Sequence, residues 1–313
     1  MSLLERYQVL RVDSQTIKAK NITQNLHTVQ FSDDENMTGS FLQLAGRPTG
    51  RFSEVNFITE LKGLHPTQTK GDANIHAKLF KAAGLAETLT PGSVAAYATG
   101  NTPNTTKVPI SLLELYRGAA QSTSGMKSTM TNVVFNMIFR FVANQIAELE
   151  FQGRGQFDHN PVADTVPALS EAAGNPLRCL NATATFAGVT LSVREFEFNL
   201  GNEIVLPENG LEKYGYDVPE IVNRAGASVR LLYKEEVPGT FDPWEIMQVS
   251  GHPQQDVTNV SVSLSIGNYA KNICSVTANF NITAAPELVP QDGIYYYQLQ
   301  GKPDLNAFSL TFT

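Results

Sequence analysis

The sequence predicts a mainly β protein with two tandem domains, each a small β-barrel or sandwich that carries one short helix. Apolar and polar residues alternate over many short runs, which is the period of a half-buried strand. The charged fraction of 17% lies below the usual quarter, because Ser, Thr, Asn and Gln are abundant. The length of 313 residues suits two domains of ordinary size.

The domain boundary is predicted from a break in periodicity. Residues 158–178 contain three prolines, lack an apolar repeat and are interpreted as a connection. We place the first domain at 1–165, the linker at 166–178 and the second domain at 179–313. Both halves show the series strand, capped short helix, strand and longer hairpin, with few identical residues. This series predicts a diverged internal duplication.

The first half begins with a polar stretch, residues 1–38, which predicts an arm or an edge strand. Residues 41–44 and 52–61 follow as strands, separated by the turn signal GRPTG. Asp72 suits the N-cap of a helix, and apolar residues recur at helical spacing until Gly84 ends it. The expected order is therefore strand, strand and short helix.

The rest of the first half predicts a strand, a loop and a hairpin. Residues 110–116 alternate as a strand does. Residues 117–131, RGAAQSTSGMKSTMT, hold almost nothing that anchors a core and predict a long mobile loop. The apolar alternation of residues 133–157, interrupted near 143–145, predicts a hairpin.

Residues 189–207 carry the most informative pattern in the second half. Their apolar side chains change parity at Arg194–Glu195, with Val189, Leu191 and Val193 before the change and Phe196, Phe198 and Leu200 after it. Such a strand must bury both faces or bulge midway. Gly201–Asn202 suits positive φ and predicts a sharp corner.

The remaining elements of the second half follow from period and capping. Residues 229–233 predict a strand, and Asp242-Pro243-Trp244-Glu245 begins a short helix to about 249. In that helix Trp244 is expected to pack onto a sheet. Residues 260–266, 274–282 and 294–299 predict three further strands.

Composition excludes several classes of function. The net charge of −7, without a dense Lys/Arg run, argues against tight binding of nucleic acid. The sequence lacks signal-peptide and membrane-span patterns, so we expect a soluble chain that does not insert into membranes. Cys179 and Cys274 are expected as buried thiols, with a bridge between them as the alternative.

Catalytic and metal-binding patterns are missing from the sequence. It has no phosphate-binding loop, dinucleotide fingerprint, zinc-protease motif or nucleophile elbow. Five histidines are scattered singly, and Asp158–His159 is the one acid–histidine neighbour. A turn explains that pair better than catalysis does. We therefore expect no enzyme activity, no cofactor and no metal site.

Several strands carry apolar side chains on both faces, and such strands need either a second sheet or a neighbouring subunit. Both alternatives remain open from the residues. The tyrosine triplet 295–297 also places rings on both faces of its strand. The candidate assembly interface consists of Phe139, Phe141, Phe196, Phe198, Gly201, Asn202, Tyr295 and Tyr297.

Four segments match the pattern of one known family in the same order. They are RFSEVNFITELKG at 51–63, the run at 124–157 that leads into NPVADTVPAL at 160–169, LNATATFAGVTLSVREFEFNLGNEIVLPENG at 180–210, and ASVRLLYKEEVPGTFDPWE at 227–245. Together they resemble the tail tube, or major tail, proteins of long-tailed bacteriophages. The resemblance covers most of the chain from about residue 40 to 250, and LGNEIV with its corner is its most specific part.

The resemblance implies two tail-tube-like domains that close into rings, which stack around a lumen through which DNA passes. Family members with one such domain form six-membered rings, so a duplicated chain implies a trimer with pseudo-sixfold symmetry. Hairpins 132–157 and 272–299 are expected to line the lumen as staves. An acidic lumen surface would let DNA pass without specific binding.

Partners and location also follow from the resemblance. The expected partners are further copies of the chain, the tape measure protein, and tail-terminator or baseplate proteins. The chain would be assembled in the bacterial cytoplasm and end in the virion tail. A tail-like bacteriocin or a secretion tube is a close alternative. The alternative from another class is a monomeric β-sandwich that binds carbohydrate or another ligand through Trp244 or the tyrosine triplet.

Overall fold

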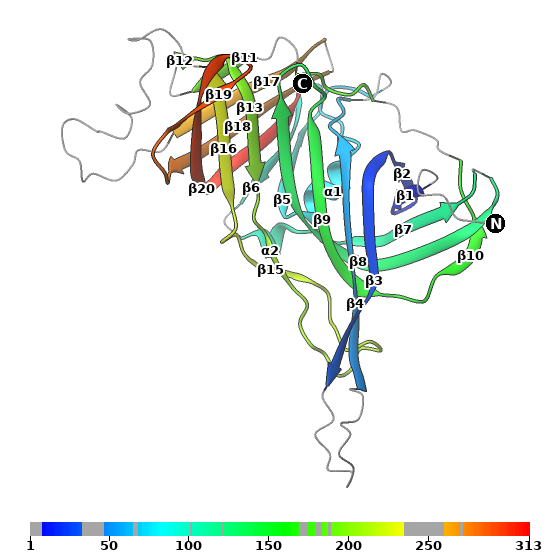
Figure 1. Cartoon of the computed structure of the whole chain (residues 1–313). Coiled ribbons are helices and arrows are strands. Elements are labelled where there is room, and N and C mark those ends of the chain that lie inside the picture. The colour runs from blue at the N-terminus through cyan, green and yellow to red at the C-terminus, as the bar shows by residue number, and fades with distance from the viewer. Residues whose placement is uncertain are drawn as a thin grey trace.

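The fold is mainly β, as predicted, in a computed structural model of the chain (Figure 1). The residues described by the structure are 8–32, 47–64, 68–100, 102–120, 122–168, 174–179, 183–186, 189–234, 260–269 and 272–313. Within these ranges the chain forms strands β1 to β20 and two short helices.

The first half contributes strands β1 to β10 and both helices of the described chain. Its strands are β1 (Gln8–Val12), β2 (Gln15–Ile17), β3 (Ala19–Ser32), β4 (Arg47–Glu60), β5 (Leu85–Thr90), β6 (Val94–Thr99), β7 (Ile110–Gly118), β8 (Ser124–Val142), β9 (Glu148–Phe157) and β10 (Val162–Thr165). Its helices are α1 (Ala77–Ala82) and α2 (Pro103–Thr106).

The second half is all strand where it is described. Its strands are β11 (Thr183–Phe186), β12 (Val189–Thr190), β13 (Val193–Asn199), β14 (Glu203–Val205), β15 (Glu220–Asn223), β16 (Ser228–Lys234), β17 (Val260–Tyr269), β18 (Asn272–Ile282), β19 (Glu287–Gln291) and β20 (Ile294–Phe312).

One antiparallel sheet runs through both halves of the chain. Its central strands are hydrogen-bonded in the order β3, β4, β9, β8, β13, β16 and β20. The step from β8 to β13 crosses from the first half to the second, and β20 returns to pair with β6. In Figure 1, β3 and β4 extend beyond the rest of this sheet as a long hairpin.

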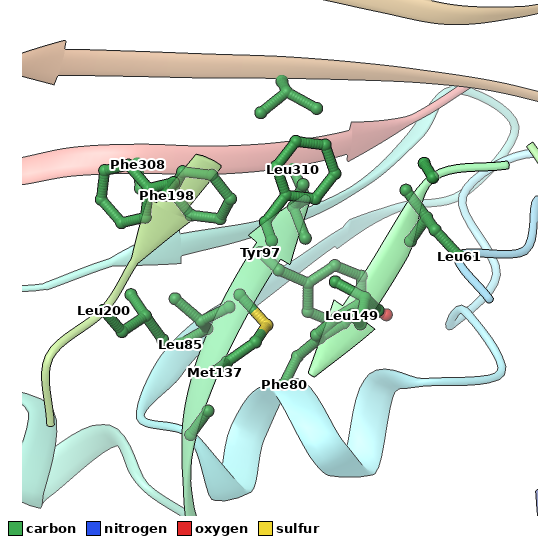
Figure 2. Close-up of a cluster of buried hydrophobic side chains, with 14 of the residues drawn as sticks. Leu61, Phe80, Leu85, Tyr97, Met137, Leu149, Phe198, Leu200, Phe308 and Leu310 are labelled. Carbon is green, nitrogen blue, oxygen red and sulfur yellow. The ribbon is translucent and has the colours of Figure 1, made fainter. Parts of the chain in front are cut away.

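A single large hydrophobic cluster also spans both halves. Phe80 of α1 contacts Tyr97 of β6, with 4.8 Å between ring centroids. Phe198 of β13 stacks on Phe308 of β20 at 4.2 Å, beside Leu200 (Figure 2). Because one core and one sheet join the halves, the elements that surround any site come from distant parts of the sequence. The division into two tandem domains stays a prediction.

The predicted connection at 166–178 packs against the first half where it is described. Val166 is buried and its main-chain N–H donates to the Thr123 carbonyl. Leu177 is buried and exchanges main-chain hydrogen bonds with Leu61 and Ala147. The longer interpretation of 158–178 as a connection is wrong at β10, which pairs with β8. The proline-rich composition of this stretch did not indicate the short edge strand.

The predicted mobile loop at 117–131 is wrong. Residues 110–118 form β7 and residues 124–142 form β8, so only a short turn separates the two strands. The first part of β8 is hydrogen-bonded to β7 on one edge and to β10 on the other. Ser128 and Thr129 are buried between these neighbours. These residues are polar and show no apolar alternation, so their pattern did not indicate a strand. Hydrogen bonds with the neighbouring strands hold it in place.

Two local predictions also need correction. The sequence GRPTG was expected as a turn, but Arg47 to Gly50 continue β4, where they pair with residues of β3. The helix begins later than expected, with His76 at the N-cap, while Asp72 accepts hydrogen bonds from the N–H and hydroxyl of Thr69. Its end is as predicted, because Gly84 adopts φ +75° just beyond Ala83.

The strand predictions at 110–116, 133–157 and 229–233 are confirmed by β7, the β8–β9 hairpin and β16. The single hairpin expected at 272–299 is wrong. Instead, β18 pairs with residues 301–312 of β20, and β19 forms a separate hairpin with 294–298. The strand at 41–44 and the helix at 242–249 with Trp244 lie outside the described residues.

Candidate assembly surface

The four phenylalanines predicted for assembly lie in the core of their own chain. In the β8–β13 pair, Phe139 is opposite Phe198 and Phe141 is opposite Phe196. All four side chains are at most 2% exposed. The structure therefore corrects their proposed placement, since they have no surface to offer a neighbouring subunit in this conformation. Their contribution is to hold the first half against the second.

A bulge in β13 explains the change of apolar parity within residues 189–207. The register between β13 and β16 shifts between Val193 and Glu195, so one extra residue is accommodated there. Leu191 before the bulge and Phe196 after it are both buried in the same core. Of the two alternatives open from the sequence, the midway bulge is correct.

The second apolar face of β8 is covered within the chain. Val134 is fully buried on the opposite side of β8 from Phe135, against Ile204 of β14 and Ile221 of β15. The strands β14 and β15 form a separate two-stranded sheet. At this position the second apolar face of β8 is covered by a second sheet and not by a neighbouring subunit.

Gly201 and Asn202 make the sharp corner that the sequence predicts. Gly201 adopts φ +63°, and a Cβ built on it would lie 1.9 Å from the Ala227 nitrogen. Only glycine fits such a left-handed position against neighbouring backbone. The corner ends β13 and starts β14, so it turns the chain from the main sheet to the small sheet that covers β8.

Asn202 is buried and ties three segments together. Its side-chain N–H groups donate to the carbonyls of Ala83, just after α1, and Phe135 of β8, at 2.8 and 2.9 Å. Its side-chain oxygen accepts from Nε of Arg224 at 2.8 Å. Full use of both ends of the amide makes this residue a structural clamp, and it leaves no polar group for a partner.

The two candidate tyrosines lie differently from each other. Tyr297 stacks on Tyr233 with 5.6 Å between ring centroids and packs against the core. Tyr295 is 52% exposed at the β19–β20 turn, near the exposed Leu288 and Ile294. Tyr296, on the other face, contacts the Arg194 guanidinium. Of the predicted interface residues, Tyr295 alone offers an exposed ring, and its role in assembly stays a prediction.

The outer face of the central sheet carries a ladder of charged side chains. Arg140 lies between Glu150 and Glu197, at 2.6 and 2.9 Å. Arg154 pairs with Glu54 at 3.0 Å, and Lys20 pairs with Glu148. Strand register and ion pairs place the following residues on this face: Glu54, Glu60, Glu148, Glu150, Glu195, Glu197, Lys20, Arg140, Arg154, Arg194, Arg230 and Lys234. This set holds as many basic residues as glutamates, so the charges on the face balance.

A groove of about 520 Å³ opens on the same outer face. It is lined by amide and charged side chains, including Asn56, Asn136, Gln152 and Arg154, with Ile204 at one side. Among the described residues that line it, none is aromatic. A carbohydrate site usually presents an aromatic ring for the apolar face of a sugar, so this groove gives little support to the carbohydrate alternative.

The one acid–histidine neighbour does not form a catalytic relay. Thr129 donates its hydroxyl hydrogen bond to Asp158 at 3.0 Å, and both lie near the same ring nitrogen, Nε2, of His159. The other nitrogen, Nδ1, lies 2.8 Å from the Asn160 carbonyl. In a relay, nucleophile and acid contact opposite nitrogens of the histidine. The group therefore resembles a turn more than a catalytic site.

Within the described part of the chain, no group of three or more metal-ligating side chains gathers, and no helix is long and apolar enough to cross a membrane. Cys179 and Cys274 are both free and buried, as expected from the sequence, so the alternative bridge is not formed. Burial raises the pKa of the Cys179 thiol to about 11.

Comparison with known proteins adds no assignment. No protein-family model matches the sequence, and no curated protein is significantly similar to it.

Two residues of this region were not singled out from the sequence. Arg224 is half-buried beside the corner and donates to Asn202 and to the Gly84 carbonyl. Leu211 is 94% exposed in the loop after β14. The sequence signals were weak, since Arg224 stands alone before a Gly-containing turn and Leu211 stands alone among polar residues.

Proposed function

We propose that the chain is a structural subunit of a phage tail tube, forming stacked rings around a lumen that conducts DNA. One observation carries the proposal. The tail-tube-like segments at 51–63, 124–157, 180–210 and 227–245 are far apart in sequence, yet they supply strands that lie next to one another. Their strands β4, β9, β8, β13 and β16 are consecutive neighbours in one sheet.

The outer face of that sheet supports a role beside DNA. DNA carries a dense line of negative charge, so a conduit must avoid the basic patches that bind phosphate. On this face the arginines are engaged by glutamates, as Arg140 is by Glu150 and Glu197. A surface whose basic side chains are paired with glutamates keeps them from binding phosphate, so DNA would slide along it without sticking. The proposal therefore orients the β8–β9 hairpin with its outer face toward the lumen.

Assembly requires contacts between copies, and the sheet has edges that suit them. Among the described strands, β3 pairs only with β4, and β10 pairs only with β8. Unpaired edges present main-chain donors and acceptors to another chain. The proposed partners are further copies of the chain, the tape measure protein and terminator or baseplate proteins. The proposed ring holds three copies, on the prediction that one chain carries two tail-tube-like domains.

Electron microscopy of the purified chain tests the proposal. Negative-stain images at increasing protein concentration should contain rings or tubes, and class averages viewed down the axis should show threefold symmetry. Monodisperse monomers at high concentration would contradict the tube and favour a monomeric binding module. Rings with six copies of the chain would keep the tube but overturn the trimer. A positive potential along the channel of the assembled ring would overturn the sliding mechanism.

A further inference from the structure

The loop after β14 presents one apolar side chain on a rigid support. Leu211 is 94% exposed at its tip. The loop is closed by main-chain hydrogen bonds from Asn209 to Gly215 and from Glu212 to Asn209, at 2.9 and 3.1 Å. The Asn209 side-chain oxygen also accepts the N–H of Leu211. A single exposed leucine is ordinary, but a preorganised one loses little conformational entropy on binding.

The same loop is fastened to the main sheet. The Arg51 N–H of β4 donates to the Tyr214 carbonyl at 3.0 Å, and the Tyr214 ring packs edge-on against Phe157 of β9 at 4.8 Å. Glu212 directly follows Leu211, so the tip combines an apolar side chain with a carboxylate. We name Leu211 and Glu212 the plug.

A pocket of about 380 Å³ lies elsewhere on the chain, between the α2–β15 region and β20. Buried apolar side chains of Phe198, Leu200 and Ala307 contribute to its lining, and Gly100 lies at its wall. This volume lies at the lower end of the roughly 300–1,000 Å³ that is usual for a ligand-binding pocket. The pocket is therefore suited to an apolar group.

Arg224 adds a positive charge to the lining of this pocket, to which Asp304 contributes a negative one. Its Nε donates to the Asn202 side-chain oxygen at 2.8 Å and its Nη2 to the Gly84 carbonyl at 3.2 Å. Both acceptors are neutral. Burial lowers the pKa of Arg224 to about 10, and it remains charged at neutral pH. A partly buried guanidinium held only by neutral acceptors is suited to receive a carboxylate.

We propose that this pocket receives the plug of a second copy of the chain, with Leu211 in the apolar part and the Glu212 carboxylate on the Arg224 guanidinium. The inference names one self-contact of the proposed tube and rests on that function. Plug and pocket are different surfaces, so the contact is head-to-tail. Repeated head-to-tail contacts close into rings or continue as filaments, which matches a tube subunit.

Cysteine crosslinking tests the contact directly. One chain carries Leu211→Cys and a second chain, distinguishable by a size tag, carries Gly100→Cys. Gly100 accepts a side chain, because a Cβ built on it would lie 4.0 Å from Thr106 Cγ2, the nearest described atom outside its own chain neighbours. The native Cys179 and Cys274 are buried and do not compete. Mild oxidation of the mixture should give a disulfide-linked heterodimer.

The matched control replaces Leu211→Cys by Leu89→Cys, since Leu89 is an exposed leucine on β5. We expect at least tenfold more heterodimer from the Leu211 pair than from the Leu89 pair. Equal yields from the two pairs, or no heterodimer from either, would overturn the inference.

Assembly of two further variants separates this inference from the proposed function. Leu211→Asp disables the plug and Gly100→Leu fills the pocket, with Gly100→Ala as the small control. Each disabled chain alone should form no rings, while their mixture should gain a plug-to-pocket heterodimer that neither chain forms alone. Rings of the wild type together with rings of both disabled variants would reject the contact and keep the tube. Crosslinking without rings of the wild type would keep the contact and reject the tube.

Discussion

Asn202 donates a side-chain hydrogen bond of 2.8 Å to the main-chain carbonyl of Ala83, across 119 positions of sequence. Ala83 is the residue at the end of α1, where carbonyl groups lack partners within the helix. The corner after β13 thus caps a helix from the other half of the chain. This relationship makes the Gly201–Asn202 corner a part of the folding core, and the first two predictions test it.

Asn202→Ala should destabilise the fold. The change leaves the buried carbonyls of Ala83 and Phe135 without their side-chain donors, and it removes the neutral acceptor of Arg224. Each buried polar group left without a partner costs about 1–3 kcal/mol, so a loss of at least ~2 kcal/mol in the free energy of unfolding is expected. Urea denaturation measures it. Gln300→Ala, on an exposed part of β20, serves as the control and should change stability little.

Gly201→Ala and Gly92→Ala form a matched pair. Both glycines have positive φ, at +63° and +76°, so both substitutions carry the backbone strain of about 1–2 kcal/mol. At Gly201 the new Cβ would also collide with the main chain of Gly226 and Ala227, whereas at Gly92 it meets no atom within 4 Å. We expect Gly92→Ala to fold with a modest loss of thermal stability and Gly201→Ala to fold poorly. Equal melting temperatures for the two variants would show that the corner adjusts freely.

Phe198→Asp should prevent folding, while Tyr295→Asp should leave the chain folded. Phe198 is buried and stacked on Phe308, so the substitution places an unpaired charge in the core. Tyr295 is half exposed and can exchange its ring for a carboxylate in water. Soluble expression and circular dichroism check both outcomes. If Tyr295 contributes to the proposed tube, its variant remains folded but forms fewer rings in micrographs, and unchanged ring formation would remove it from the interface.

Stability should fall in mildly acidic solution through His76. This histidine is fully buried, and desolvation lowers its pKa from 6.5 to about 4, despite its hydrogen bond with the Glu60 carbonyl. Below pH 6.5 the unfolded chain gains a proton that the folded chain does not accept until about pH 4. The folded state therefore loses up to about 1.4 kcal/mol for each pH unit across this window.

The matched variant for this prediction is His76→Gln, which keeps a side-chain N–H donor but has no proton to gain. Unfolding free energies of both proteins are measured from pH 7 to pH 4.5. The stability of the wild type should fall more steeply than that of His76→Gln, since acidic groups affect both proteins alike. Parallel pH profiles would show that His76 is not the source of the dependence.

Much of the local structure follows from local sequence. Alternation at 133–157 predicts the β8–β9 hairpin, and Gly84 and Gly201 mark the end of α1 and the corner after β13. These features depend on residues a few positions apart, through strand period and the conformational freedom of glycine. Period and turn chemistry therefore identify them without any knowledge of the fold.

Pairing between strands that are distant in sequence decided the remaining secondary structure. Residues 124–131 are a strand because β7 pairs with them on one edge, while β10 and then β9 pair on the other. Their small polar side chains do not indicate this pairing. The last residues of β20 likewise gain their strand from β18 and β6. Strand pairing is a long-range interaction, so composition within one segment does not determine it.

The sequence by itself determined that the chain is mainly β. It also determined where a bulge or a second apolar face had to occur and where the chain had to turn. The tertiary structure decided which way the apolar side chains face. Phe139 and Phe198 lie in the core because β13 pairs in register with β8 after its bulge against β16, and Val134 is covered by β14 and β15. Alternation fixes which side chains share a face, but only the packing of distant strands decides whether that face meets a core, water or a second copy of the chain.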